Sequence, residues 1–72
     1  MIADVMHEHL EELYRVYGRE TVFISESEAA KYLRVDVRTV QRDKSFPSRT
    51  FGAKSKHRRV SLINFAYWLA HS

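Results

Sequence analysis

Residues 25–44 read SESEAAKYLRVDVRTVQRDK and predict two short helices joined by a tight turn. Ser25 and Glu28 have the S-x-x-E spacing of a capping box, in which the serine oxygen and the glutamate carboxylate each accept a hydrogen bond from a free N–H at the helix start. Ile24 directly precedes this pair and can supply a hydrophobic staple. A helix is therefore expected to begin directly after Ser25.

The first helix is expected to end at Arg34 and Val35, with Val35 anchoring the turn. Asp36 can then cap a second helix, because aspartate accepts hydrogen bonds from free N–H groups at a helix start. Ala30 is small enough to let two helices cross closely, as a helix-turn-helix requires. The apolar stripe of the first helix consists of Ala29, Ala30 and Leu33.

The second helix, residues 37–44, carries the chemistry that points to a nucleic acid. With Val40 facing inward, the opposite face presents arginines one turn apart and a glutamine. Arginine matches the acceptors of guanine and glutamine those of adenine in the major groove. A charged outer face is also typical of any surface helix, which is the alternative interpretation. The expected DNA-binding residues of this helix are Val37, Arg38, Thr39, Gln41, Arg42 and Lys44.

A basic β-hairpin is expected after this helix. Pro47 forbids helix continuation, and Phe46 before it is expected to plug the core. Residues 49–52 and 57–60 read as two short strands around a small and basic tip at residues 53–56. Such a tip suits contact with phosphates or the minor groove, and a flexible solvated loop is the alternative. The expected DNA contacts of this wing are Arg49, Lys54, Lys56, His57, Arg58 and Arg59.

The two ends of the chain are expected to form amphipathic helices. The apolar residues of the first helix are Ile2, Met6, Leu10, Leu13 and Tyr17, with Gly18 as a natural stop. The last helix begins at Ser61 and is apolar on so much of its circumference that it must meet more than one neighbour. The first helix is the candidate for the second neighbour, which would make it a lid; a dimer or partner contact is the alternative. Trp68 is expected in the core, and residues 21–24 as a linker or a small strand pairing with the wing.

Charge is distributed unevenly along the 72 residues. Residues 1–28 hold seven acids and two bases, a charge of −5, whereas residues 29–72 hold two acids and ten bases, a charge of +8. The high positive charge of residues 29–72 indicates a surface that faces phosphates. The acids of the first helix should point away from DNA.

Other classes of function find little support in the composition. We see no glycine-rich phosphate loop, cysteine nucleophile or recognisable carboxylate pair, so neither an enzyme nor a cofactor is expected. His7 and His9 lack the spacing of a metal-binding motif. The absence of cysteine fits a reducing cytoplasm, and neither a membrane span nor a signal peptide is visible.

A longer pattern resembles a known family. The order A-A-x-x-L-x-V-x-x-x-T-V-x-R, then F-P, a glycine, an arginine cluster and F-x-x-W-L resembles the AlpA/excisionase-like group of small winged helix-turn-helix proteins, DNA binders of phages and mobile elements that are distantly similar to the DNA-binding domain of MerR regulators. The likeness covers residues 24–69. Arg34 stands where the family usually has glycine, and Asp36 where it commonly has serine or threonine. The matching residues are Ala30, Leu33, Val35, Thr39, Val40, Arg42, Phe46, Pro47, Gly52, Arg58, Arg59, Phe65, Trp68 and Leu69.

The expected fold is a single mainly α domain with a small β-hairpin, a winged helix-turn-helix with an extra N-terminal amphipathic helix. Its parts are an acidic helix at 1–18, the helix-turn-helix at 25–44, the wing at 49–60 and a C-terminal helix at 61–71. If the turn needs a positive φ, Arg34 must accept a backbone conformation that glycine adopts more readily.

Three functions are compatible with these features. The resemblance implies a sequence-specific DNA-binding protein that acts as an excisionase, a recombination directionality factor that helps direct an integrase. A small phage transcriptional regulator of the same fold is the second hypothesis. A protein-interaction module that binds a partner through the N-terminal helix is the third. The expected partners are double-stranded DNA, an integrase or neighbouring copies on DNA, or a second copy in a homodimer through the N-terminal helix; no membrane is expected.

Overall fold

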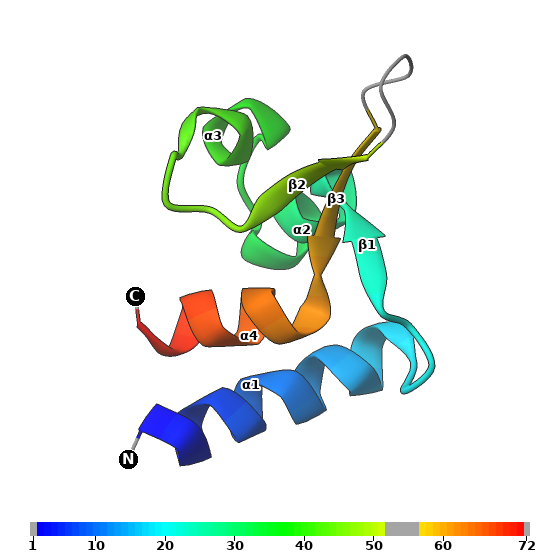
Figure 1. Cartoon of the computed structure of the whole chain (residues 1–72), viewed down its shortest axis with the longest axis vertical. Helices are drawn as coiled ribbons and strands as arrows, with labels where there is room; N and C mark the ends of the chain where they lie inside the picture. The colour runs from blue at the N-terminus through cyan, green and yellow to red at the C-terminus, as the bar shows by residue number, and fades with distance from the viewer. Residues whose placement is uncertain (1, 52–56, 72) are drawn as a thin grey trace.

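The computed structural model describes residues 2–51 and 57–71, together with the side chains of residues 3–50 and 58–71. These residues form a mainly helical fold with a small antiparallel sheet, as the sequence predicts (Figure 1). In chain order the elements are α1 (Ile2–Tyr17), β1 (Phe23–Ser25), α2 (Glu26–Leu33), α3 (Val37–Arg42), β2 (Ser48–Phe51), β3 (His57–Ser61) and α4 (Leu62–Ala70). None of the described helices has the length and apolar character needed to cross a membrane.

Helices α1 and α4 lie side by side and run in opposite directions (Figure 1). Leu13 of α1 is fully buried, and Met6, Leu10 and Tyr17 pack around the same core. The side chain of Ile2, the remaining member of the predicted stripe, lies outside the described part. The expectation that α1 closes the core against the C-terminal helix is therefore confirmed.

Local hydrogen bonds begin the shorter helices where the sequence predicts them. The N–H of Glu28 donates to Ser25 Oγ at 3.1 Å, and the N–H of Ser25 donates to Glu28 Oε1 at 3.4 Å, which completes the capping box of α2. Ser61 Oγ accepts from the N–H of Asn64 at the start of α4. These bonds satisfy backbone donors that lack a partner inside the helix.

The turn between α2 and α3 is closed by the backbone. Arg34 has φ 59° and ψ 41°, which is the left-handed conformation. Its N–H donates to the Lys31 carbonyl at 3.1 Å, and the N–H of Val35 donates to the Ala30 carbonyl at 3.0 Å. This is the Schellman pattern of helix ends. Val35, which was expected to anchor the turn, closes it through its backbone N–H, and its side chain is 41% exposed.

The three strands pair antiparallel in the order β1-β3-β2. Strand β1 aligns Ile24 with Val60, so the β-rich segment before α2 is a strand that pairs with the hairpin rather than a linker. Strand β2 aligns Arg49 with Arg59 in the same hairpin. Residues 52–56, which include Gly52 and the predicted wing tip, lie outside the described residues.

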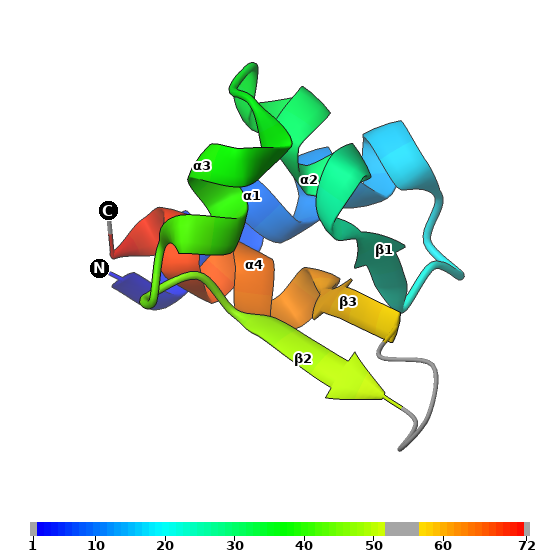
Figure 2. The ribbon, with the colours of Figure 1, turned by 90° about the horizontal axis from the view of Figure 1, so that it is seen from above.

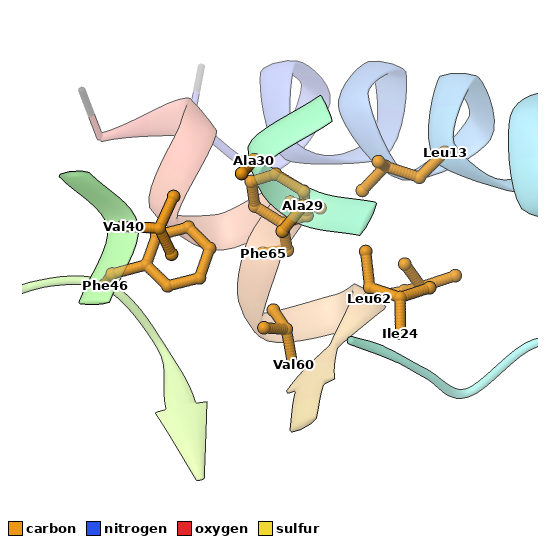
Figure 3. Close-up of a cluster of buried hydrophobic side chains, with 10 residues drawn as sticks. Leu13, Ile24, Ala29, Ala30, Val40, Phe46, Val60, Leu62 and Phe65 are labelled. Atoms are coloured by element: carbon orange, nitrogen blue, oxygen red, sulfur yellow. The ribbon is translucent and has the colours of Figure 1, made fainter. Parts of the chain in front are cut away.

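The core lies between the helices and the sheet (Figure 3). Phe65 is fully buried, and its ring centre lies 5.5 Å from that of Phe46 and 5.6 Å from that of Tyr32. Phe46 is buried as predicted, with Trp68 half-buried against it at 5.1 Å. Edge-to-face ring pairs of this kind add to the stabilisation from burial itself. The placement of Trp68 in the core is confirmed.

Candidate nucleic-acid interface

The position of α3 follows from its cap and its one buried residue. Asp36 Oδ1 accepts a hydrogen bond from the N–H of Arg38 at 2.8 Å, which starts the helix. Val40 is buried and turns the opposite face outward. The predicted side chains exposed on α3 are Arg38, Thr39, Gln41 and Arg42.

Two predictions about this helix need correction. Val37 was expected on the outer face, but it is partly buried and packs against the core, three residues before Val40 on the same side of the helix. The helix ends at Arg42 rather than Lys44. Asp43 Oδ1 accepts from the N–H of Ser45 at 2.9 Å, a local bond that competes with helix continuation. Lys44 is exposed in the turn that follows.

Both acids near α3 are engaged by their own segment of chain. Asp36 caps the helix, and Asp43 also accepts from the hydroxyl of Ser45 at 2.6 Å. The hydrogen bonds from the Ser45 hydroxyl and N–H lower the pKa of Asp43. Ser45 Oγ in turn accepts from Trp68 Nε1 at 3.2 Å, which links the end of α3 to α4. Sequence reasoning missed this link, since the two residues are far apart in the chain.

The β2–β3 hairpin divides its arginines between two faces. Side chains alternate along a strand, so Arg58 shares the core-facing side with Val60, and Arg59 lies on the other side. Arg58 Nη2 lies 3.3 Å from Glu26 Oε2 in α2. This predicted DNA contact is thus paired with a carboxylate, although its side chain remains 44% exposed. Arg49 and Arg59 are exposed cross-strand partners on the outer side.

The described cations that lack a carboxylate partner all belong to one half of the sequence. Among the described residues, the ion pairs join Arg15 to Glu12, Arg19 to Glu11 and Arg58 to Glu26. The described cations outside these pairs are Lys31, Arg34, Arg38, Arg42, Lys44, Arg49 and Arg59, and all belong to the basic half of the sequence. Lys54 and Lys56 of the predicted site lie outside the described residues, as does the side chain of His57.

The acidic helix α1 lies apart from the two elements predicted to contact DNA (Figure 1). Helix α3 and the hairpin lie on the side away from α1 (Figure 1). Figure 2, which looks onto that side, shows that α3 and the hairpin lie apart from each other. The acids of α1 are exposed; they are Asp4, Glu8, Glu11 and Glu12. Within the described part, no three potential metal ligands come together.

No family model, curated protein or solved structure matches this chain. The interface therefore has to be judged on its own geometry. Exposed guanidinium and amide donors can bind anions and the acceptor edges of bases when the neighbouring carboxylates, here Asp36 and Asp43, accept hydrogen bonds from their own segment of chain. Glu26 and Ser48, which hold the hairpin to α2, were not predicted, because nothing in the local sequence marks Glu26 as buried.

Proposed function

We propose that this protein binds double-stranded DNA as a winged helix-turn-helix, with α3 as the recognition helix and the β2–β3 hairpin as the wing. The observation that carries the proposal is that four of the seven described cations outside ion pairs lie on these two elements, namely Arg38, Arg42, Arg49 and Arg59. Electrostatic contact with phosphates supplies most of the sequence-independent affinity of such proteins. The acidic side of α1 then faces away from the duplex.

Helix α3 has dimensions and side chains that fit the major groove. An α-helix with its side chains is about 10–12 Å across, which matches a major groove about 12 Å wide. Arg38 and Arg42 lie one turn apart, with Gln41 beside them. We assign base reading to these three side chains and positioning to Lys44.

The hairpin offers a pair of arginines suited to phosphate. Like charges directly opposite each other on neighbouring strands are unfavourable in the free protein. A phosphate beside Arg49 and Arg59 would relieve that repulsion, and guanidinium groups bind phosphate with two parallel hydrogen bonds. The hairpin therefore acts on affinity and register, while α3 acts on sequence choice.

Excisionase activity is our first choice of biological role, because the sequence resembles excisionase-like proteins from residue 24 to residue 69. A phage transcriptional regulator would bind DNA through the same parts. A footprint across the protein's own genomic neighbourhood separates them: protection beside a recombination site and an adjacent integrase gene favours excision, and protection over a promoter alone favours regulation. The protein-interaction alternative has no such support, since the apolar stripe of α1 packs on α4 in the same chain.

DNA binding itself is tested with a random duplex titrated at increasing salt. We expect tight binding at low salt, and we expect R49Q/R59Q to bind more weakly with a salt slope reduced by up to about two contacts, at about 0.9 per phosphate. The matched control is R15Q/R19Q, which removes the same charge from the α1 side and should behave like the unmodified protein. Equal loss in both variants would mean that only net charge matters, and no binding at low salt would reject the proposal.

A further inference from the structure

Glu26 is the only buried charged side chain among the side chains that the structure describes. Its carboxylate lies at the start of α2 and is 7% exposed. Ser48 Oγ of β2 donates a hydrogen bond to Glu26 Oε2 at 2.8 Å, and Arg58 Nη2 of β3 lies 3.3 Å from the same oxygen. One carboxylate oxygen therefore joins three elements of the fold.

A buried charge is costly unless it is paired and hydrogen-bonded. Glu26 has both kinds of partner, and it also lies in the first turn of α2, where the helix dipole favours a negative charge. The same contact pairs Arg58, whose side chain is 44% exposed, with a carboxylate of the protein itself. Arg59, the next residue, lies on the opposite face of β3 without a carboxylate partner among the described residues.

We propose that Glu26 is a positioning residue of the DNA interface. It withdraws Arg58 from phosphate contact and fixes the hairpin to α2, which leaves Arg49 and Arg59 as the phosphate-binding pair of the hairpin strands. This inference rests on the proposed DNA-binding function and assigns different roles to two adjacent arginines.

Fixing the hairpin to α2 also fixes its distance from α3. Helix α3 follows α2 after a turn of three residues, residues 34–36, whose backbone is held by the hydrogen bonds of Arg34 and Val35 and by the Asp36 cap. A binding site needs its parts held within about 0.5 Å of the productive geometry. Glu26 adds a side-chain link between α2 and the hairpin to the backbone pairing of β1 with β3, so it helps to hold both parts where they can engage one duplex.

The test compares the salt slope of binding to a random duplex for the unmodified protein, E26Q/R58Q and R59Q. E26Q/R58Q replaces the ion pair with two amides of similar size and leaves net charge unchanged, so the slope should stay the same. R59Q should lower the slope by about 0.9, the value of one phosphate contact. Melting temperatures show that each variant is folded; R58Q alone is avoided because it would leave Glu26 buried without its cation.

E26Q alone separates positioning from a purely structural role. It keeps an acceptor for Ser48 but releases Arg58, so the slope should become steeper by up to about 0.9. An unchanged slope in E26Q, or a slope in E26Q/R58Q as shallow as in R59Q, would overturn the inference while leaving DNA binding intact. Failure of the unmodified protein to bind DNA would overturn the proposed function, and this inference with it.

Discussion

Arginines on two helical surfaces of this protein have different surroundings. At the end of α1, Arg15 and Arg19 lie 3.0 Å and 2.7 Å from glutamate carboxylates. On α3, Arg38 and Arg42 are also exposed but have no carboxylate partner within the described ranges. Arginine is therefore part of surface ion pairs beside α1, whereas the arginines of α3 are available as hydrogen-bond donors.

The acids explain the difference. Residues of α1 offer glutamates whose carboxylates are free to meet a neighbouring arginine. Near α3 the acids are Asp36 and Asp43, and both accept hydrogen bonds from nearby backbone N–H groups. The comparison teaches that a basic surface arises from what nearby acids are already bonded to, as much as from the number of bases.

The comparison implies that α1 contributes stability and α3 contributes binding, and Leu13 tests the first half with the largest effect. Leu13 belongs to α1, and its side chain is fully buried in the core. L13A should lower the free energy of unfolding by about 2–5 kcal/mol, because it removes buried methyl groups and leaves a cavity. Urea denaturation measures this.

V16A is the matched control on the same helix, since Val16 is 56% exposed. It should change stability by no more than about 0.5 kcal/mol. Under conditions where L13A remains folded, its affinity for DNA should equal that of the unmodified protein. A loss of affinity in the folded variant would show that α1 takes part in binding, and the division between the two regions would be wrong.

Arg42 tests the second half of the comparison. R42A should weaken binding at the footprinted site by about 1–3 kcal/mol, the discrimination of one good base contact, and weaken binding to random DNA much less. Anisotropy titrations on both duplexes measure the difference. R15A is the control and should leave both affinities unchanged. Equal losses of affinity on the two duplexes would indicate that Arg42 contacts only phosphate.

The sequence predicts the parts of this fold that depend on near neighbours. The caps at Ser25, Asp36 and Ser61 each need an N–H two or three residues away, and the stripe of α1 follows from helical periodicity. These interactions are visible in sequence because spacing alone determines them. The positive φ of Arg34 was considered only as a condition, because the resembled family usually has glycine at that position.

The parts that depend on strand register could not be predicted. Arg58 and Arg59 look equivalent in sequence, and only the alignment of β3 with its neighbours places Arg58 toward Glu26. A shift of one residue would exchange the two faces. The prediction that Val37 lies on the outer face failed for a similar reason. The width of the buried face of α3 depends on how closely the core approaches that helix.

Tyr17 connects α1 to α2 and provides a smaller, pH-dependent test. Its hydroxyl donates to the Glu28 carbonyl at 3.0 Å. Burial, and then the charges of Glu28 and Tyr32, raise the pKa of Tyr17 above its ordinary value of 10.0. The folded state thus keeps Tyr17 neutral after the unfolded chain begins to ionise. The contribution of this raised pKa to the free energy of unfolding is complete below pH 10, and it is lost as the pH rises through the pKa of Tyr17 in the folded state.

Y17F should cost about 0.5–1.5 kcal/mol at neutral pH, the net value of one hydrogen bond. It should also reduce the loss of stability between neutral pH and pH 11, measured by urea denaturation at each pH. Y67F is the control because Tyr67 is exposed on α4, and it should leave the alkaline loss unchanged. Identical pH profiles for Y17F and the unmodified protein would remove Tyr17 from this link between the two regions.

Arg34 lies in the turn that leads into α3 and carries the smallest expected effect. A side chain at φ 59° is strained by the approach of Cβ to the backbone, a strain that glycine avoids. Glycine also has more freedom to lose on folding, so the two effects partly cancel. R34G should therefore raise the free energy of unfolding by about 0.5–1 kcal/mol, the usual benefit where φ is positive.

The control is R38G, which removes the same charge two residues beyond the cap residue Asp36, where φ is negative and glycine should cost about 1 kcal/mol. Urea denaturation of both variants gives the two signs directly. Opposite signs would show that the α2–α3 turn is held in the left-handed conformation by its hydrogen bonds despite the arginine side chain. Destabilisation by R34G would mean instead that the Arg34 side chain stabilises the turn through contacts that outweigh its backbone strain.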